Sequence, residues 1–88
     1  MPVRWTKRFA RQLKKAPRQV KIRAERTSII LDSDREHPSL HLKRLQRLSG
    51  YWEIRVDDDW RIILRIEGNT FIFVAIGRHD VMEKFQEN

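Results

Sequence analysis

The sequence predicts an α+β fold in which a helical hairpin packs on a small, largely antiparallel sheet. Three observations predict it. Apolar residues recur at helical spacing in the first third of the chain, and they alternate with polar residues after residue 50. The third observation is size, because 88 residues suffice for one domain and leave no room for a second. We therefore assign residues 1–88 to a single domain.

The first helix is predicted to start after Thr6, whose hydroxyl can cap it. A short strand at residues 3–5 precedes it. Trp5, just before the cap, can staple the start of this helix from outside, and its simplest placement is in the core. The apolar residues at helical spacing within this helix are Phe9, Ala10 and Leu13.

A second helix is predicted from about residue 18 to residue 32. Pro17 ends the first helix and suits the first turn of the next, where a backbone N–H is not needed. The apolar stripe of the second helix recurs at i, i+4, i+7 and i+11 and consists of Val20, Ala24, Thr27 and Leu31. We expect the two helices to form a hairpin whose apolar stripe faces the sheet.

The segment between the second helix and residue 50 is predicted to be a connection. Residues 33–38 are polar and rich in turn formers. A short stretch follows that is either irregular or one to two helical turns long, and Gly50 ends it. The apolar residues of this stretch are Leu40, Leu42, Leu45 and Leu48.

Three strands are predicted in the second half of the chain. Residues 52–56 and 60–66 alternate apolar and polar side chains, and three aspartates at 57–59 form the turn between them. Residues 70–76 are apolar on both faces, which is typical of a strand inside a sheet. Residues 81–85 are expected to form a final helical turn or two. The predicted order is therefore β-α-α-β-β-β with a short C-terminal helix.

The three-residue turn determines which residues lie opposite one another in the first hairpin. The apolar pairs on one face are Val56 with Trp60, Ile54 with Ile62, and Trp52 with Leu64. On the other face Arg55 lies opposite Arg61. Two like charges directly opposed cost stability, so either both arginines are well solvated or they hold an anion between them. Both interpretations stay open from the sequence.

The chain is strongly basic, and its charge is unevenly distributed. Nineteen Lys and Arg against twelve Asp and Glu give a net charge of +7 and an isoelectric point near 10.6. Ten of the nineteen lie within residues 1–26, with a single acid among them. Such a field attracts polyanions, with nucleic acid first and an acidic membrane or protein second.

Composition excludes several classes of protein. The absence of cysteine excludes a disulfide framework, a thiol nucleophile and a thiolate metal site. No apolar run approaches the roughly 20 residues of a membrane span, and no signal segment opens the chain, so we expect a cytoplasmic protein without a membrane partner. Glycine occurs only at positions 50, 68 and 77, which leaves no phosphate-binding glycine loop.

Three histidines are candidates for proton transfer or metal binding. His79 lies just past the third strand, a common position for working residues on a rigid scaffold, and is the candidate for catalysis. His37 and His41 are spaced i, i+4, as zinc ligands on a helix can be, but Pro38 disfavours a helix there and no third ligand is evident. We therefore expect no metal site and no cofactor. His37 is expected at the surface, and His41 has a purely structural role as its simplest interpretation.

Three segments of the chain resemble the RelE/ParE superfamily of toxins from bacterial and archaeal toxin–antitoxin modules. They are residues 45–56 (LQRLSGYWEIRV), 60–66 (WRIILRI) and 75–80 (AIGRHD). Length, basic charge and element order agree as well, so the resemblance covers nearly the whole chain. It implies the RelE-like fold, and the histidine-bearing members that resemble YafQ and HigB fit best.

The resemblance implies an endoribonuclease that cleaves mRNA on the ribosome without a metal ion. Such cleavage needs a base for the 2′-hydroxyl, cations for the crowded phosphorane and an acid for the 5′-oxygen. His79 matches the catalytic histidine of these members and is expected to be the acid, with Arg61 and Arg55 binding the phosphate. The candidates for the base, in order, are His41, Asp59 and Glu53. The side chains expected to stack on RNA bases are Trp60 and Phe85.

The resemblance also implies the partners. They are a cognate antitoxin protein, the ribosome with its mRNA, and operator DNA only through the antitoxin complex. The residues expected to dock on ribosomal RNA phosphates are Lys7, Arg8, Arg11, Lys14, Lys15, Arg18 and Lys21. Three alternatives stay open: a ParE-like toxin that poisons gyrase, a non-catalytic nucleic-acid-binding module, and a degenerate toxin that only binds its antitoxin.

Overall fold

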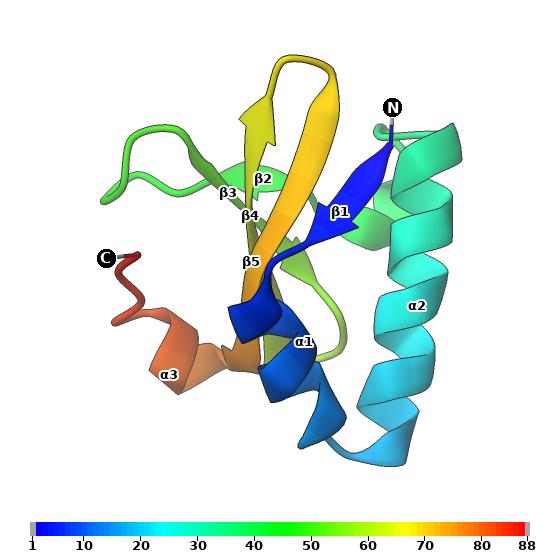
Figure 1. The fold of residues 1–88 in the computed structure, drawn as a ribbon, viewed down its shortest axis with the longest axis vertical. Helices are drawn as coiled ribbons and strands as arrows, with labels where there is room; N and C mark the ends of the chain where they lie inside the picture. The colour runs from blue at the N-terminus through cyan, green and yellow to red at the C-terminus, as the bar shows by residue number, and fades with distance from the viewer. Residues whose placement is uncertain (1, 88) are drawn as a thin grey trace.

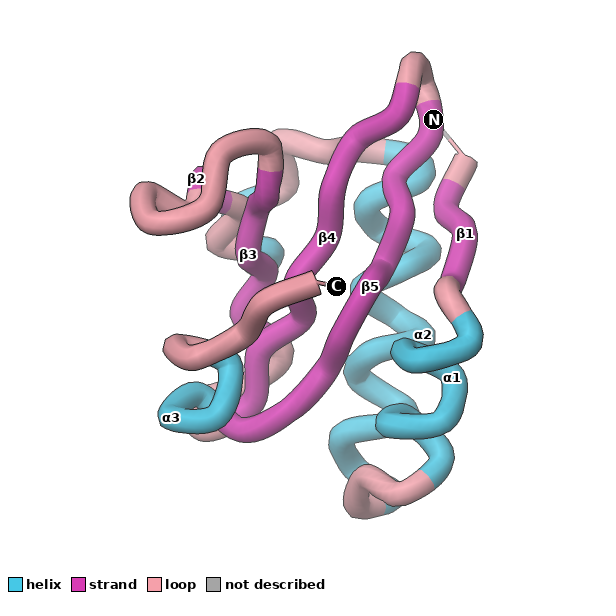
Figure 2. Tube along the Cα trace, turned by 60° about the vertical axis from the view of Figure 1, so that its left-hand side comes forward, coloured by secondary structure: helices cyan, strands magenta, loops and turns pink. Residues whose placement is uncertain are grey.

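The computed structural model describes residues 2–87 and has the predicted α+β architecture (Figure 1). Two helices lie on one face of a five-stranded sheet, and the C-terminal segment lies on the other face (Figure 2). The elements in chain order are β1 (Val3–Trp5), α1 (Lys7–Lys14), α2 (Arg18–Ser33), the 3₁₀ turn η1 (Pro38–Leu40), β2 (Lys43–Arg44), β3 (Tyr51–Arg55), β4 (Trp60–Glu67), β5 (Thr70–Arg78) and α3 (His79–Met82).

The strands follow the order β1-β5-β4-β3-β2 across the sheet. β1 runs parallel to β5, and every other neighbouring pair is antiparallel. The sheet is therefore largely antiparallel, as predicted. β5 lies inside the sheet, as its two apolar faces indicated, and β4 is the middle strand.

The first helix starts where the sequence placed it. The Thr6 side chain accepts a hydrogen bond from the backbone N–H of Phe9 at 3.0 Å, which caps the helix. Phe9 and Leu13 are buried in the core. The prediction that Trp5 lies in the core is wrong, since Trp5 is 43% exposed. β1 is a three-residue edge strand, so the indole covers Phe9 from outside, with ring centroids 5.1 Å apart.

The second helix buries the stripe that its spacing predicted. All four stripe residues are buried, and Pro17 stands just before the first helical residue in an extended conformation. The outer surface of α2 carries two exposed isoleucines, Ile22 and Ile29.

The connection after α2 is mostly irregular, with one 3₁₀ turn at Pro38–Leu40 and a two-residue strand, β2. Its leucines divide between the two faces of the sheet. Leu40 and Leu42 pack into the core on the helix side, whereas Leu45 and Leu48 pack into a second cluster on the opposite face.

The sheet is covered by apolar side chains on both faces. The second cluster gathers Ile63 and Val74 from the strands with Met82 and Phe85 from the C-terminal segment. The final helix begins at His79, two residues earlier than predicted, and forms a single turn. It can start directly after β5 because the backbone N–H of His79 bonds to the carbonyl of Asp59 at 2.7 Å.

No helix within residues 2–87 is both long enough and apolar enough to cross a membrane.

Candidate functional site

The predicted register of the first hairpin is present, and Arg55 lies directly opposite Arg61. The two arginines have different surroundings. Arg55 is exposed, whereas Arg61 is only 7% exposed. The Nη1 group of Arg61 donates to the carbonyls of Asp57, Asp58 and Trp60 at 2.6, 3.2 and 3.0 Å. Arg61 therefore braces the turn between β3 and β4, and Arg55 is the member of the pair that faces solvent.

Glu53 lies on the same face and compensates the buried guanidinium. Its Oε1 is 3.6 Å from Nε of Arg61 and 3.7 Å from Nζ of Lys43. Glu53 itself is 9% exposed. The Glu53 carboxylate therefore neutralises an arginine that the fold has taken out of water.

His79 stands at the end of the same face, where β5 passes into α3. Its Nε2 lies 3.3 Å from a carboxylate oxygen of Glu83, one helical turn later. The side chain of His79 is 48% exposed, so a substrate can reach the ring. The backbone bond between His79 and Asp59 places the end of the β3–β4 turn beside this histidine. The side chain of Asp59 is exposed.

His41 is separated from this group. It adopts a left-handed backbone conformation with φ of 48° at the end of η1. It lines a hollow of about 340 Å³ together with His37 and Trp52, and Trp52 packs on the helix side of the sheet. Among residues 2–87, no hydrogen bond or ion pair joins His41 to His79 or Arg61. Nor do the residues described contain a cluster of three His, Cys, Asp or Glu able to hold a metal ion.

Both aromatic residues expected to stack on bases pack against the protein, Phe85 completely and Trp60 in part. Trp60 is half-buried and packs against the helix-side core. Phe85 is 3% exposed, with its ring 6.0 Å from that of Tyr51 and 4.8 Å from the guanidinium carbon of Arg8. In this conformation Phe85 is a core residue, because the C-terminal segment folds back over the sheet instead of extending into solvent.

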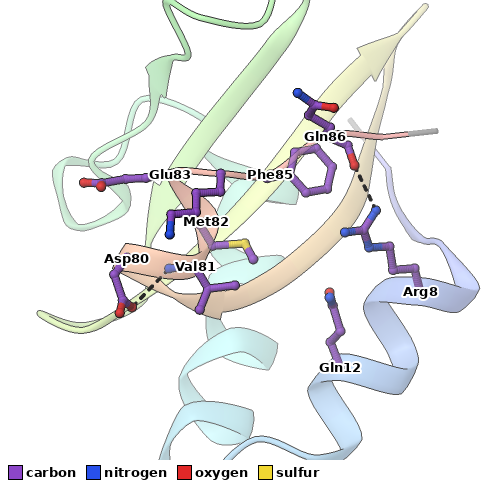
Figure 3. Close-up of a pocket in the computed structure, with 9 residues that line it drawn as sticks. Arg8, Gln12, Asp80, Val81, Met82, Glu83, Phe85 and Gln86 are labelled. Atoms are coloured by element: carbon purple, nitrogen blue, oxygen red, sulfur yellow. Dashed lines mark hydrogen bonds between the residues drawn. The ribbon is translucent and has the colours of Figure 1, made fainter.

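Most of the Lys and Arg side chains of the α1–α2 hairpin that are expected to bind RNA phosphates face solvent. Arg8 is the exception, since its Nη1 donates to the carbonyl of Gln86 at 3.2 Å and its guanidinium covers Phe85 (Figure 3). The remaining predicted cations are exposed or half-exposed: Lys7, Arg11, Lys14, Lys15, Arg18 and Lys21.

Sequence reasoning missed a set of residues that hold the C-terminal segment against the sheet. Arg47 donates to the carbonyls of Phe85 and Met82, both at 2.6 Å. The Tyr51 hydroxyl and Nε of Arg65 both donate to Glu87. The hydrogen bond to Glu87 is the largest cause that raises the pKa of Tyr51, and burial and the negative charge of Glu87 raise it further. Strand parity alone could have placed Tyr51 and Arg65 on the face that carries Arg55.

The model of the family described as the ParE toxin of type II toxin–antitoxin systems, parDE, matches residues 3–82. Comparison with curated protein sequences gives no match.

Several solved structures share the fold. The RelB–RelE antitoxin–toxin complex from Methanococcus jannaschii matches with a TM-score of 0.77 and 20% identity, over 91% of this chain and 94% of that one. YafQ from E. coli strain BL21(DE3) matches with a TM-score of 0.75 and 17% identity, over the same shares of the two chains. The RelBE2 toxin–antitoxin complex from Mycobacterium tuberculosis matches with a TM-score of 0.71 and 25% identity, over 89% and 96%.

Proposed function

We propose a function from one premise: the chain belongs to the ParE toxin family of type II toxin–antitoxin systems. It is the toxin of such a pair, and its partner is a cognate antitoxin protein. The RelB–RelE and RelBE2 structures are toxin–antitoxin complexes of proteins with this fold, which supports a protein partner of the same kind here. Operator DNA is contacted only through the complex with the antitoxin.

The activity we propose is ribosome-dependent cleavage of mRNA. The observation that carries this proposal is the position of His79, a half-exposed imidazole paired with Glu83 at the end of the sheet face that carries Arg55. A histidine side chain has an ordinary pKa of about 6.5 and can give or take a proton at neutral pH. A cation beside such a group can stabilise a phosphorane.

Each step of the reaction has a side chain assigned to it. His79 acts as the general acid and protonates the 5′-oxygen as it leaves, with Glu83 orienting the ring through Nε2. Arg55 binds the phosphate, because the guanidinium of Arg61 is buried and already donates hydrogen bonds to backbone carbonyls. Asp59 removes the proton from the 2′-hydroxyl. Asp59 is exposed, and its backbone carbonyl accepts from the N–H of His79, whereas Glu53 is held between two cations and His41 lines a different hollow.

The test compares wild type with His79→Ala in cells, using primer extension on a translated reporter mRNA. Wild type is expected to arrest growth and to cut within translated codons, and the variant should lose about 10²–10⁴-fold of the cleavage. His37→Ala is the matched control, since His37 is exposed and its ring bonds to Ser39 within its own turn. Uncut mRNA in arrested wild-type cells would refute the ribonuclease proposal.

A second function, poisoning of gyrase, is favoured by two observations. The matching family model is that of ParE, the branch for which the resemblance implies gyrase as the target. In addition, Arg61, the arginine expected to bind phosphate, is buried within the turn. A gyrase poison would leave mRNA intact, stall replication and keep its toxicity in the His79→Ala variant, so the same experiment separates the two functions.

A further inference from the structure

The carboxylate of Glu87 lies between two hydrogen-bond donors on the sheet. One of its oxygens, Oε1, accepts from the Tyr51 hydroxyl and from Nε of Arg65, the latter at 3.2 Å. Tyr51 and Arg65 are directly paired across β3 and β4, so the two donors are held side by side by the ladder. The side chain of Arg65 is 28% exposed and also pairs with Glu67. The chain thus contains a formed anion site that its own C-terminal segment fills.

Glu87 can leave this site without disturbing the core. The segment before it is anchored at Phe85, which is buried and whose carbonyl accepts from Arg47. Arg8 holds the next carbonyl, that of Gln86, from the other side (Figure 3). Glu87 follows these anchors, with an exposed backbone and a side chain that is 27% exposed. Exchanging its carboxylate for another anion therefore requires movement of little more than one side chain.

The site lies in line with the cations of the proposed catalytic face. Arg61 and Arg65 are four residues apart on β4, which separates them by about 13 Å along the strand. Arg55 lies opposite Arg61 at one end, and Tyr51 lies opposite Arg65 at the other. An RNA strand that placed its cleaved phosphate beside His79 and Arg55 could pass the outer side of the C-terminal segment and reach Arg65.

We infer that Arg65 and Tyr51 form a binding site for a phosphate group of the RNA backbone, and that Glu87 fills this site when no RNA is bound. The inference rests on the proposed ribonuclease function. A non-bridging phosphate oxygen accepts the same guanidinium and hydroxyl donors as a carboxylate oxygen does. Glu87 is then a competitor of the substrate, and its release is part of RNA binding.

The test measures binding of a single-stranded 2′-O-methyl oligoribonucleotide, which lacks the attacking hydroxyl, by fluorescence anisotropy over a range of salt concentrations. Glu87→Gln removes the competing charge and is expected to tighten binding several-fold. Each phosphate neutralised on a single strand adds about 0.7 to the slope of log K against log salt, so the slope should steepen by about that amount. Arg65→Gln in the Glu87→Gln background should abolish both gains, and Tyr51→Phe in that background should reduce the gain in affinity.

Glu36→Gln is the matched control, because it removes one negative charge from an exposed position in the connection after α2. If Glu87→Gln binds no better than Glu36→Gln, or if its gain persists without Arg65, the inference is overturned. Because the oligonucleotide cannot be cleaved, this result is independent of catalysis. An RNA-binding gain in a protein that never cuts mRNA would refute the proposed function and keep the anion site. If mRNA cleavage depends on His79 but Glu87→Gln binds RNA no more tightly, the proposed function stands and the anion site is refuted.

Discussion

At the scale of single residues, carboxylates determine which cations and donors are available to a substrate. Glu53 neutralises the buried Arg61, whose Nη1 donates to backbone carbonyls of the turn. Glu87 occupies Tyr51 and Arg65 in the same way at the other end of the face, but there the donors are partly exposed. Exposure therefore separates a structural ion pair from one that a substrate can displace.

The acid–base behaviour of Tyr51 tests the contact with Glu87 directly. The hydrogen bond to Glu87 raises the pKa of Tyr51 above the ordinary value of about 10 for a tyrosine, and the positive charge of Arg65 opposes the rise. A raised pKa in the folded state means that the contact contributes stability at pH values below about 10 and that this contribution is lost as the pH rises through the folded-state pKa. Tyr51 is the only tyrosine in the chain, so phenolate absorbance reports this group alone.

We expect the absorbance midpoint of Glu87→Gln to lie below that of wild type, and that of Glu36→Gln to match wild type. Tyr51→Phe should remove the transition altogether, which verifies the assignment. Equal midpoints in wild type and Glu87→Gln would mean that the contact does not form in solution.

At the scale of elements, α2 shows how one helix is divided between core and surface. Leu31 is 1% exposed and belongs to the helix-side cluster, whereas Ile29, two residues earlier, is 71% exposed. Both are large aliphatic residues in the last part of the same helix. Burial on the sheet, and not apolar character, therefore decides which of them stabilises the fold.

Leu31→Ala is expected to lower the free energy of unfolding by about 2–5 kcal/mol, because it removes buried methyl groups and leaves a cavity. Ile29→Ala should change it by no more than about 0.5 kcal/mol. Denaturant unfolding followed by far-UV circular dichroism measures both. Comparable losses in the two variants would contradict the assignment of the buried face.

At the scale of the whole molecule, charge is concentrated on the helical side while the candidate catalytic residues lie across the sheet. The hairpin carries most of the predicted phosphate contacts as exposed side chains, whereas His79 and Arg55 belong to the opposite face. Binding to a large polyanion and cleavage of a strand can therefore be performed by different surfaces of one small protein.

Replacing Lys7, Lys14 and Lys15 together with Gln tests this division. Each lost phosphate contact should reduce the slope of log K against log salt for ribosome association by about 0.7–0.9, so the slope of the triple variant should fall by about 2.1–2.7. Cosedimentation with ribosomes over a range of salt concentrations measures the slope. If the triple variant has the slope and the melting temperature of wild type, the hairpin is not the surface that docks on the ribosome.

The sequence by itself determined the two longer helices, every strand except β2, and the register of the first hairpin. These features depend on neighbours a few residues away: the Thr6 cap, the i, i+4 stripe of α2 and the three-residue turn after Val56. It also indicated the superfamily, since the matching segments are continuous in the chain.

Only the tertiary structure decided which of the candidate residues come together. It separated His41 from His79, buried the rings of Phe85 and, in part, Trp60, and paired Tyr51 with a carboxylate 36 residues later. The physical reason is that such contacts depend on how the C-terminal segment packs across the sheet. That packing is set by the apolar cluster beneath Phe85 and by the arginines that bind its backbone carbonyls, and no local pattern of residues records it.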